Sequence, residues 1–126
     1  LLANTGRMPE AMDWYESAIE LAPNDNSIRL DFARSLQTNS MTTDAEAQFL
    51  RVLEADPDSI SGHYYLAKLY MDWKPQRREE AQVHFERVVE INPDSFLAEQ
   101  ARLELEALTR TTPAGTPGAS TPVSGP

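Results

Sequence analysis

The sequence predicts an all-α fold in which antiparallel helix hairpins stack in a row. Three prolines close the same pattern, in which an alanine precedes the proline by twelve residues, an aromatic residue by eight and a small or β-branched apolar residue by five. The prolines are 34 and 36 residues apart. A period in this range is typical of stacked helical hairpins, which form a binding surface. The three copies are Ala11, Tyr15, Ala18 and Pro23; Ala45, Phe49, Val52 and Pro57; and Ala81, Phe85, Val88 and Pro93.

Apolar residues at helical spacing predict each helix in turn. The first begins at Pro9, because a proline costs no hydrogen bond in the first turn of a helix, and it ends before Pro23, which prevents continuation. Thr43 and Glu46 have the spacing of a capping box and predict the start of the third. The prolines and the apolar stripes place the helices at residues 9–21, 27–38, 43–55 and 60–73, then one that ends at 91 and one at 95–109.

Two other stretches depart from the hairpin pattern. The connector 74–78 holds the two residues by which the last repeat is longer, and Pro75 stands where the next helix should start. Residues 111–126 contain four prolines and three glycines, and they contain no charged or aromatic side chain. Such a composition cannot bury enough surface to offset the entropy of ordering, so we expect a disordered linker or free C-terminus, with a Thr/Pro-rich stalk as the alternative.

Composition limits the partners. The 126 residues suffice for one domain, and the net charge of −9 argues against nucleic acid and against an anionic membrane surface as partners. There is no cysteine, no apolar run as long as a membrane span and no recognisable signal peptide. Because the chain starts at Leu1, we expect a piece of a longer parent. A soluble, cytoplasmic location is favoured, and the extracytoplasmic part of an anchored parent remains open.

The marker residues resemble those of the tetratricopeptide repeat family. The third unit matches at Leu66, Ala67, Tyr70, Ala81, Phe85 and Pro93, and the second at Phe32, Ala33, Leu36, Ala45, Phe49 and Pro57. Arg29 and His63 stand where the family has tryptophan. The resemblance implies a right-handed superhelical array, an α-solenoid, over residues 1–110. Its units would be 1–25, 26–59 and 60–95, with Gly6 as the first turn glycine, and helix 95–109 would be a solvating cap or the start of another unit.

In this family the first helix of each unit lines a concave groove, and the resemblance places there seven side chains: Leu30, Arg34, Gln37, Tyr64, Lys68, Met71 and Asp72. Arg34 and Lys68 hold the same position in successive units and should therefore be stacked neighbours. One interpretation is that both bind the acidic group of an extended peptide. The other is that both pair with acidic residues of the groove itself, at Asp31, Asp72 or Glu104. The family's capture of C-terminal carboxylates does not transfer, because Leu30 occupies the position of its first lysine.

No constellation in the sequence indicates catalysis, a metal or a cofactor. His63 and His84 lie in different helices without further ligands, and Asn24-Asp25-Asn26 runs straight into a helix, which favours capping over calcium binding. We therefore expect a non-enzyme. Trp14 and Trp73 are candidate partner contacts, with packing of the lengthened connector as the alternative for Trp73.

The function predicted from the sequence is that of a protein–protein interaction scaffold or adaptor that binds a peptide or partner domain in the groove. Two alternatives remain: a structural module that self-associates, or a non-catalytic appendage of a larger parent, either membrane-anchored or enzymatic. Self-association would use the truncated N-terminal edge as a homo-oligomer contact, where Tyr15, Ala18 and Leu36 should be exposed for lack of a neighbouring helix.

Overall fold

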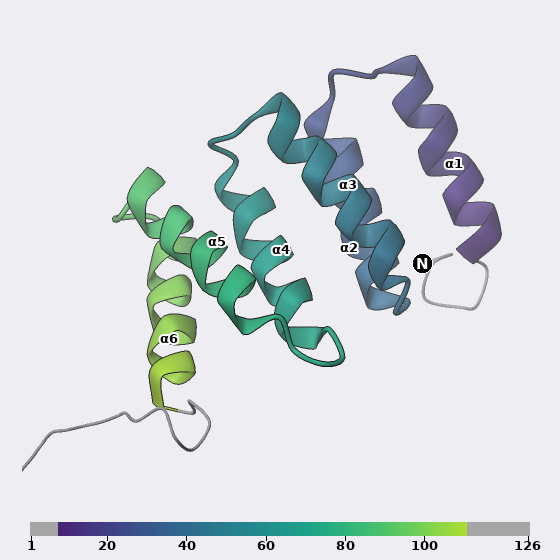
Figure 1. Cartoon of the computed structure of the whole chain (residues 1–126). Helices are drawn as coiled ribbons and strands as arrows, with labels where there is room; N and C mark the ends of the chain where they lie inside the picture. Colours follow the sequence, from purple (N-terminus) through teal and green to yellow (C-terminus); the bar gives the residue numbers. More distant parts are fainter. Residues whose placement is uncertain (1–7, 111–126) are drawn as a thin grey trace, which may run out of the picture.

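The computed structural model describes residues 8–110, which form six α-helices and no strand (Figure 1). The expected helices are all present, and their bounds differ from the expected ones by at most one residue. The tail 111–126 and the first residues, including Gly6, lie outside the described residues. The helices are α1 (Met8–Leu21), α2 (Asn26–Thr38), α3 (Thr42–Ala55), α4 (Ile60–Asp72), α5 (Arg78–Ile91) and α6 (Phe96–Arg110).

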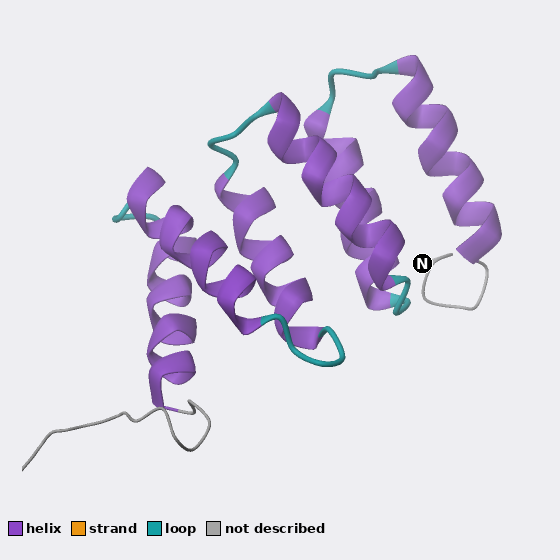
Figure 2. Ribbon diagram, in the orientation of Figure 1, coloured by secondary structure: helices purple, strands orange, loops and turns teal. Residues whose placement is uncertain are grey.

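The helices form an inner and an outer row. The pairs α2/α3 and α4/α5 are hairpins, with α1 before them and α6 after them (Figure 2). In the described part of the chain α2 contacts α4 and α4 contacts α6, whereas α3 contacts neither α1 nor α5. The first helices of successive hairpins are therefore closer together than the second helices, and the array curves with α2, α4 and α6 on its inner side.

Side chains of the proline turns cap the inner helices, as the sequence predicts. The Asp25 carboxylate accepts hydrogen bonds from the backbone N–H groups of Ser27 (3.0 Å) and Ile28 (3.4 Å). Ser59 Oγ accepts one from the N–H of Gly62 at 3.0 Å. These bonds satisfy donors that have no partner inside the helix. The same chemistry thus explains the polar residues after Pro23 and Pro57.

The expected capping box at Thr43 and Glu46 is wrong. Helix α3 begins at Thr42, and its N-cap residue Met41 makes no side-chain capping bond. The carboxylate of Glu46 is used elsewhere, because it accepts a hydrogen bond from Tyr70 at 2.7 Å. A contact with α4, 24 residues away in sequence, therefore replaces the local one.

The marker residues build one continuous core. The alanines Ala33, Ala45, Ala67 and Ala81 have no exposed surface, and neither does Phe49 or Phe85. Small side chains allow the helices of a hairpin to approach closely, and each phenylalanine fills the space beside its alanine one turn earlier. The buried markers confirm the hairpin register taken from the prolines.

The N-terminal edge differs from the expectation. Leu36 is completely buried, so its predicted exposure is wrong; it belongs to the core that α2 shares with α3. Tyr15 and Ala18 are half-buried, and the Tyr15 ring stacks on Phe32 with the ring centres 5.0 Å apart. The apolar surface lies instead on the other side of α1, at Trp14 (60 % exposed) and Leu21 (88 % exposed).

The lengthened connector between α4 and α5 is fixed by Arg77. Its guanidinium lies over the rings of Tyr70 (4.6 Å) and Trp73 (4.5 Å). Arg77 also donates hydrogen bonds to Glu80 (2.7 Å) and Glu46 (3.4 Å). Trp73 is half-buried within this cluster, which favours its packing interpretation over a partner contact.

The exposed face of α6 is mixed, because Phe96 (70 % exposed) and Leu103 (55 % exposed) lie there together with acidic side chains. Its residues Glu99 and Glu106 are exposed and occupy the repeat positions of His63 and Tyr70, both of which are buried in α4. The inward residues of α6 are apolar, among them Ala98. A glutamate pair suits a solvating cap, whereas the exposed Leu103 stands at the repeat position of the buried Ala67, so the cap and the start of another unit both stay predictions. Among residues 8–110 no helix is long and apolar enough to cross a bilayer.

Candidate functional site

The seven side chains expected in the groove all belong to α2 and α4, the two inner helices that contact each other. Four of them, Leu30, Gln37, Lys68 and Met71, are half-buried. Arg34 and Asp72 are exposed, and Tyr64 is buried. Whether this set binds a ligand stays a prediction, but six of its members present surface for contact.

Arg34 is held on an aromatic ring and has no ionic partner. Its guanidinium carbon lies 4.2 Å from the centre of the Tyr65 ring. A cation over the face of an aromatic ring is attracted by the ring's electron density, which positions the arginine without neutralising it. No carboxylate among residues 8–110 forms an ion pair with Arg34. Its charge is therefore available for an acidic group of a ligand.

Lys68 differs from Arg34, because it is already paired. Its Nζ atom donates a hydrogen bond to Glu104 Oε2 on α6 at 2.9 Å. Burial opposes the lysine charge, but the hydrogen bond and the charge of Glu104 outweigh it and raise the pKa of Lys68. The internal-pairing interpretation thus describes Lys68, with Glu104 as the partner, and it does not describe Arg34.

The two neighbouring tyrosines of α4 have different roles. Tyr64 is only 9 % exposed, and its ring meets Phe85 edge-on with the centres 5.7 Å apart. Burial is the main cause that raises the pKa of the Tyr64 hydroxyl. Tyr65, which the sequence reasoning did not select, is the ring under Arg34. The signal that could have revealed it is the aromatic type of a residue next to a groove position, since a ring there can reach the preceding unit.

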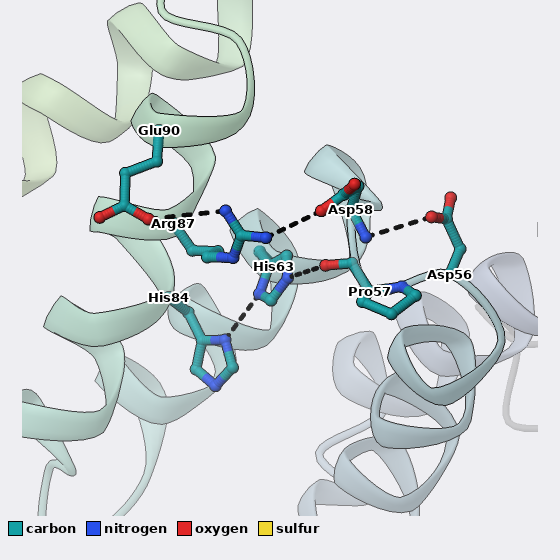
Figure 3. Close-up of polar contacts among 7 residues, drawn as sticks. All are labelled: Asp56, Pro57, Asp58, His63, His84, Arg87 and Glu90. Atoms are coloured by element: carbon teal, nitrogen blue, oxygen red, sulfur yellow. Dashed lines mark hydrogen bonds and ion pairs between the residues drawn. The ribbon is translucent and has the colours of Figure 1, made fainter.

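A pair of histidines lies outside the groove (Figure 3). His63 Nε2 is 2.7 Å from the carbonyl oxygen of Pro57, so this nitrogen carries the donated proton. His63 Nδ1 lies 2.9 Å from His84 Nδ1 and accepts its N–H. Burial lowers the pKa of His63, and it lowers the pKa of His84 to about 4 with a contribution from His63.

This pair was not expected, because 21 residues separate the two histidines on different helices. Both are neutral at physiological pH in this arrangement, and a hydrogen bond between their Nδ1 atoms joins the two rings. No group of three or more His, Asp or Glu side chains within residues 8–110 has the geometry to hold a metal ion. The pair therefore fastens α4 to α5 and to the preceding turn.

These features define a class: an array of helical hairpins with one continuous inner face of exposed and half-buried side chains. The tetratricopeptide repeat family model matches residues 1–25. The match covers 25 of the 126 residues, and together with the hairpin architecture and the solved structures below it shows an all-α fold similar to that of tetratricopeptide repeat proteins.

Solved structures of this family share the fold. YrrB, described as a TPR protein with an unusual peptide-binding site, is 29 % identical with a TM-score of 0.67, over 81 % of this chain and 52 % of YrrB. The chain thus spans about half the length of YrrB. The first TPR of Spaghetti (RPAP3), bound to the HSP90 peptide SRMEEVD, and the first TPR domain of human RPAP3 are each 20 % identical. For each the TM-score is 0.71, over 86 % of this chain and 82 % of the other. No curated protein sequence matches the chain.

Proposed function

We propose that this array is a protein-interaction module whose inner face binds an extended peptide through an acidic group. The observation that carries the proposal is Arg34, which is exposed, fixed on Tyr65 and without an ionic partner in the described part of the chain. The chain has a net charge of −9, so its own acidic residues outnumber its basic ones. A cation left unpaired in such a chain, at a fixed position, suits a carboxylate brought by a partner.

The neighbouring side chains suit a peptide. Leu30 and Met71 offer partly exposed apolar surface, and Gln37 offers both a donor and an acceptor. Lys68 contributes a second cation only if the ligand replaces Glu104 as its partner. An acidic group should therefore bind first at Arg34, with the peptide continuing along α4. Because the side chains stand on packed helices, binding requires little change of shape.

The structural relatives support this use of the fold. YrrB carries a peptide-binding site, and the first TPR of Spaghetti is bound to a peptide with the acidic sequence SRMEEVD. In this chain the groove would serve a scaffold or adaptor without catalysis, in keeping with the absence of a catalytic constellation in the sequence.

The test is selection from a phage-displayed library of random twelve-residue peptides on the immobilised chain. The selected peptides should contain an Asp or Glu, and they should shift the backbone amide signals of α2 and α4 in NMR titrations. Arg34→Gln should weaken binding about tenfold, as expected for loss of a charge-assisted hydrogen bond. Gln is chosen because it removes the charge and keeps the side chain extended.

Two results would contradict the binding of an acidic peptide in the groove. One is that the selected peptides lack acidic residues, and the other is that Arg34→Gln leaves their affinity unchanged. The control is Arg102→Gln, which removes one positive charge from the outward face of α6. It should leave the affinity unchanged if net charge alone does not drive binding.

A second candidate function, self-association, is favoured by the exposed side chains Trp14 and Leu21 on α1. They lie seven residues apart and thus on one face of the helix. Sedimentation of the chain at several concentrations tests it. A dimer that Trp14→Ser dissociates would support self-association, whereas a monomer at all concentrations would exclude it.

A further inference from the structure

An open depression of about 580 Å³ lies where the turn before α2 meets α3. None of the seven groove side chains lines it. Its lining is formed by Pro23, Asn26, Arg29, Ala47, Leu50, Arg51, Glu54 and Ala55. Two of these residues are arginines. We call this depression the α3 pocket.

The corresponding site in the third unit shows that these arginines lack a carboxylate partner from the proline turn. Arg87 of α5 is the repeat counterpart of Arg51, and Asp58 is the counterpart of Asn24. Arg87 Nη2 binds the Asp58 carboxylate at 2.8 Å, and Nη1 lies 3.5 Å from Glu90 (Figure 3). In the third unit, therefore, a carboxylate from the proline turn reaches the arginine of the second helix.

The second unit has no such carboxylate. A neutral amide stands at Asn24, and Arg51 is exposed without an ion pair among residues 8–110. Arg29 reaches only the carbonyl oxygen of Pro23, at 3.5 Å. Gln48, which occupies the repeat position of His84, has a buried Oε1 atom with no hydrogen-bond partner in the described residues. The second unit thus keeps the arginine of the third unit and lacks the turn carboxylate that pairs with it there.

We propose that the α3 pocket binds the carboxylate of an Asp or Glu side chain from a partner protein. The carboxylate takes the place that Asp58 holds in the third unit and accepts hydrogen bonds from Arg51, with Arg29 adding positive charge at the pocket. An apolar residue beside it in the partner packs on Leu50, which is 44 % exposed and lines the same pocket.

The acidic residue in the lining does not prevent this. Glu54 is the counterpart of Glu90, which stands beside Arg87 while Asp58 binds the same guanidinium. An arginine presents five N–H donors, so it can serve two carboxylates at once. The pocket is separate from the groove, and the chain offers an acidic partner two contact points: Arg34 on the inner row and Arg51 on the outer row.

The test is an NMR titration of the isotope-labelled chain with the peptide acetyl-Leu-Asp-Leu-amide. Saturable shifts are expected for the amides of α3 and of the turn at 22–25. Arg51→Gln should weaken this binding about tenfold. Asn24→Asp copies the third unit, so its own carboxylate should occupy Arg51 and weaken binding by a similar factor.

The reverse variant is the sharpest control. Asp58→Asn copies the second unit and frees Arg87, so the same peptide should gain a second site that shifts the amides of α5. Arg34→Gln should leave the shifts of α3 unchanged, which separates failure of this pocket from failure of the groove.

Three results would overturn the proposal. The first is equal binding of acetyl-Leu-Asn-Leu-amide, which lacks the carboxylate. The second is binding of the acidic peptide that neither Arg51→Gln nor Asn24→Asp weakens. The third is saturation of the α3 amides by inorganic phosphate when the acidic peptide fails to shift them, which would assign the pocket to phosphate instead.

Discussion

The second and third units, hairpins α2/α3 and α4/α5, share the same backbone arrangement and differ in how their polar side chains are paired. Seven residues of α4 are buried, and three of α2. Helix α4 has an inner-row neighbour on both sides, α2 and α6, whereas α2 has one only on the side of α4 and contacts α1 on the other. The third unit also pairs its polar groups internally, through His63 with His84 and Asp58 with Arg87. The second unit leaves the counterparts of these groups open. The two units therefore share a core and differ in how many of their polar groups pair within the chain.

The difference between the two units is also seen at one repeat position, which holds Arg29 in the second unit and His63 in the third. Both stand where the family has tryptophan, and each donates to the carbonyl of the proline six residues earlier, at 3.5 Å and 2.7 Å. In α6 the Arg102 guanidinium reaches the Pro93 carbonyl at 2.6 Å. What the sequence shows as a departure from the family is thus a polar substitute that secures the turn. His63 does so in a buried pair, and Arg29 at the edge of an open pocket.

The largest expected effect comes from the core that both units share. Phe49→Ala and Phe85→Ala should each lower the free energy of unfolding by about 3–5 kcal/mol, because both rings are completely buried and their loss leaves a cavity. Urea unfolding followed by circular dichroism measures the loss. A loss below about 1 kcal/mol for either variant would contradict the shared core. The control is Val83→Ala, at an exposed position of α5.

The connectors of the two hairpins provide the next comparison. The short one at 39–41 needs no side-chain cluster, whereas the lengthened one depends on Arg77 and its contacts with Glu46, Glu80 and two aromatic rings. Arg77→Met should lower the free energy of unfolding in urea denaturation, since it removes charge-assisted hydrogen bonds. Arg77→Lys should recover only part of this, because an ammonium cannot contact both carboxylates in the same fork. Full recovery by lysine would show that only the charge matters.

The histidine pair makes the third unit sensitive to acid, and the second unit has no counterpart. Because the native pKa of His84 is lowered to about 4 and that of His63 is lowered as well, the unfolded chain binds more protons between pH 6.5 and 4. The contribution of the histidine pair to the free energy of unfolding should be complete above pH 6.5 and should decrease as the pH falls below that value. Glu80, Asp56 and Asp58 act in the opposite direction by favouring the imidazolium.

His84→Gln, which places the side chain of Gln48 in the third unit, tests this. Between pH 7 and pH 5 the wild type should lose on the order of 1–2 kcal/mol of unfolding free energy, and the variant should lose less than half of that. Thermal melts across this range in buffers of constant ionic strength measure it. Identical losses in both proteins would assign the acid sensitivity to the carboxylates instead.

The sequence could predict the fold and the row of inner helices, because the prolines and their alanines report backbone geometry at fixed spacing. It could not predict which groups pair. The contacts of Glu46 with Tyr70 and of His63 with His84 each join residues more than 20 positions apart, and their partners depend on side-chain rotamers across two helices. Local rules instead assigned Glu46 to a capping box. Similarly, equal repeat positions predicted equal roles for Arg34 and Lys68, but only Lys68 lies within reach of Glu104.

The smallest expected effect follows from making the second unit resemble the third. Asn24→Asp should give Arg51 a carboxylate partner, as Asp58 does for Arg87, and raise the free energy of unfolding by about 0.2–1 kcal/mol, the range of exposed ion pairs. The gain should shrink in high salt, which screens such pairs. It should also disappear in the background Arg51→Gln, so a double-mutant cycle isolates the pair. A gain that survives in that background would come from the turn itself, and the correspondence between the two arginines would then be one of sequence position alone.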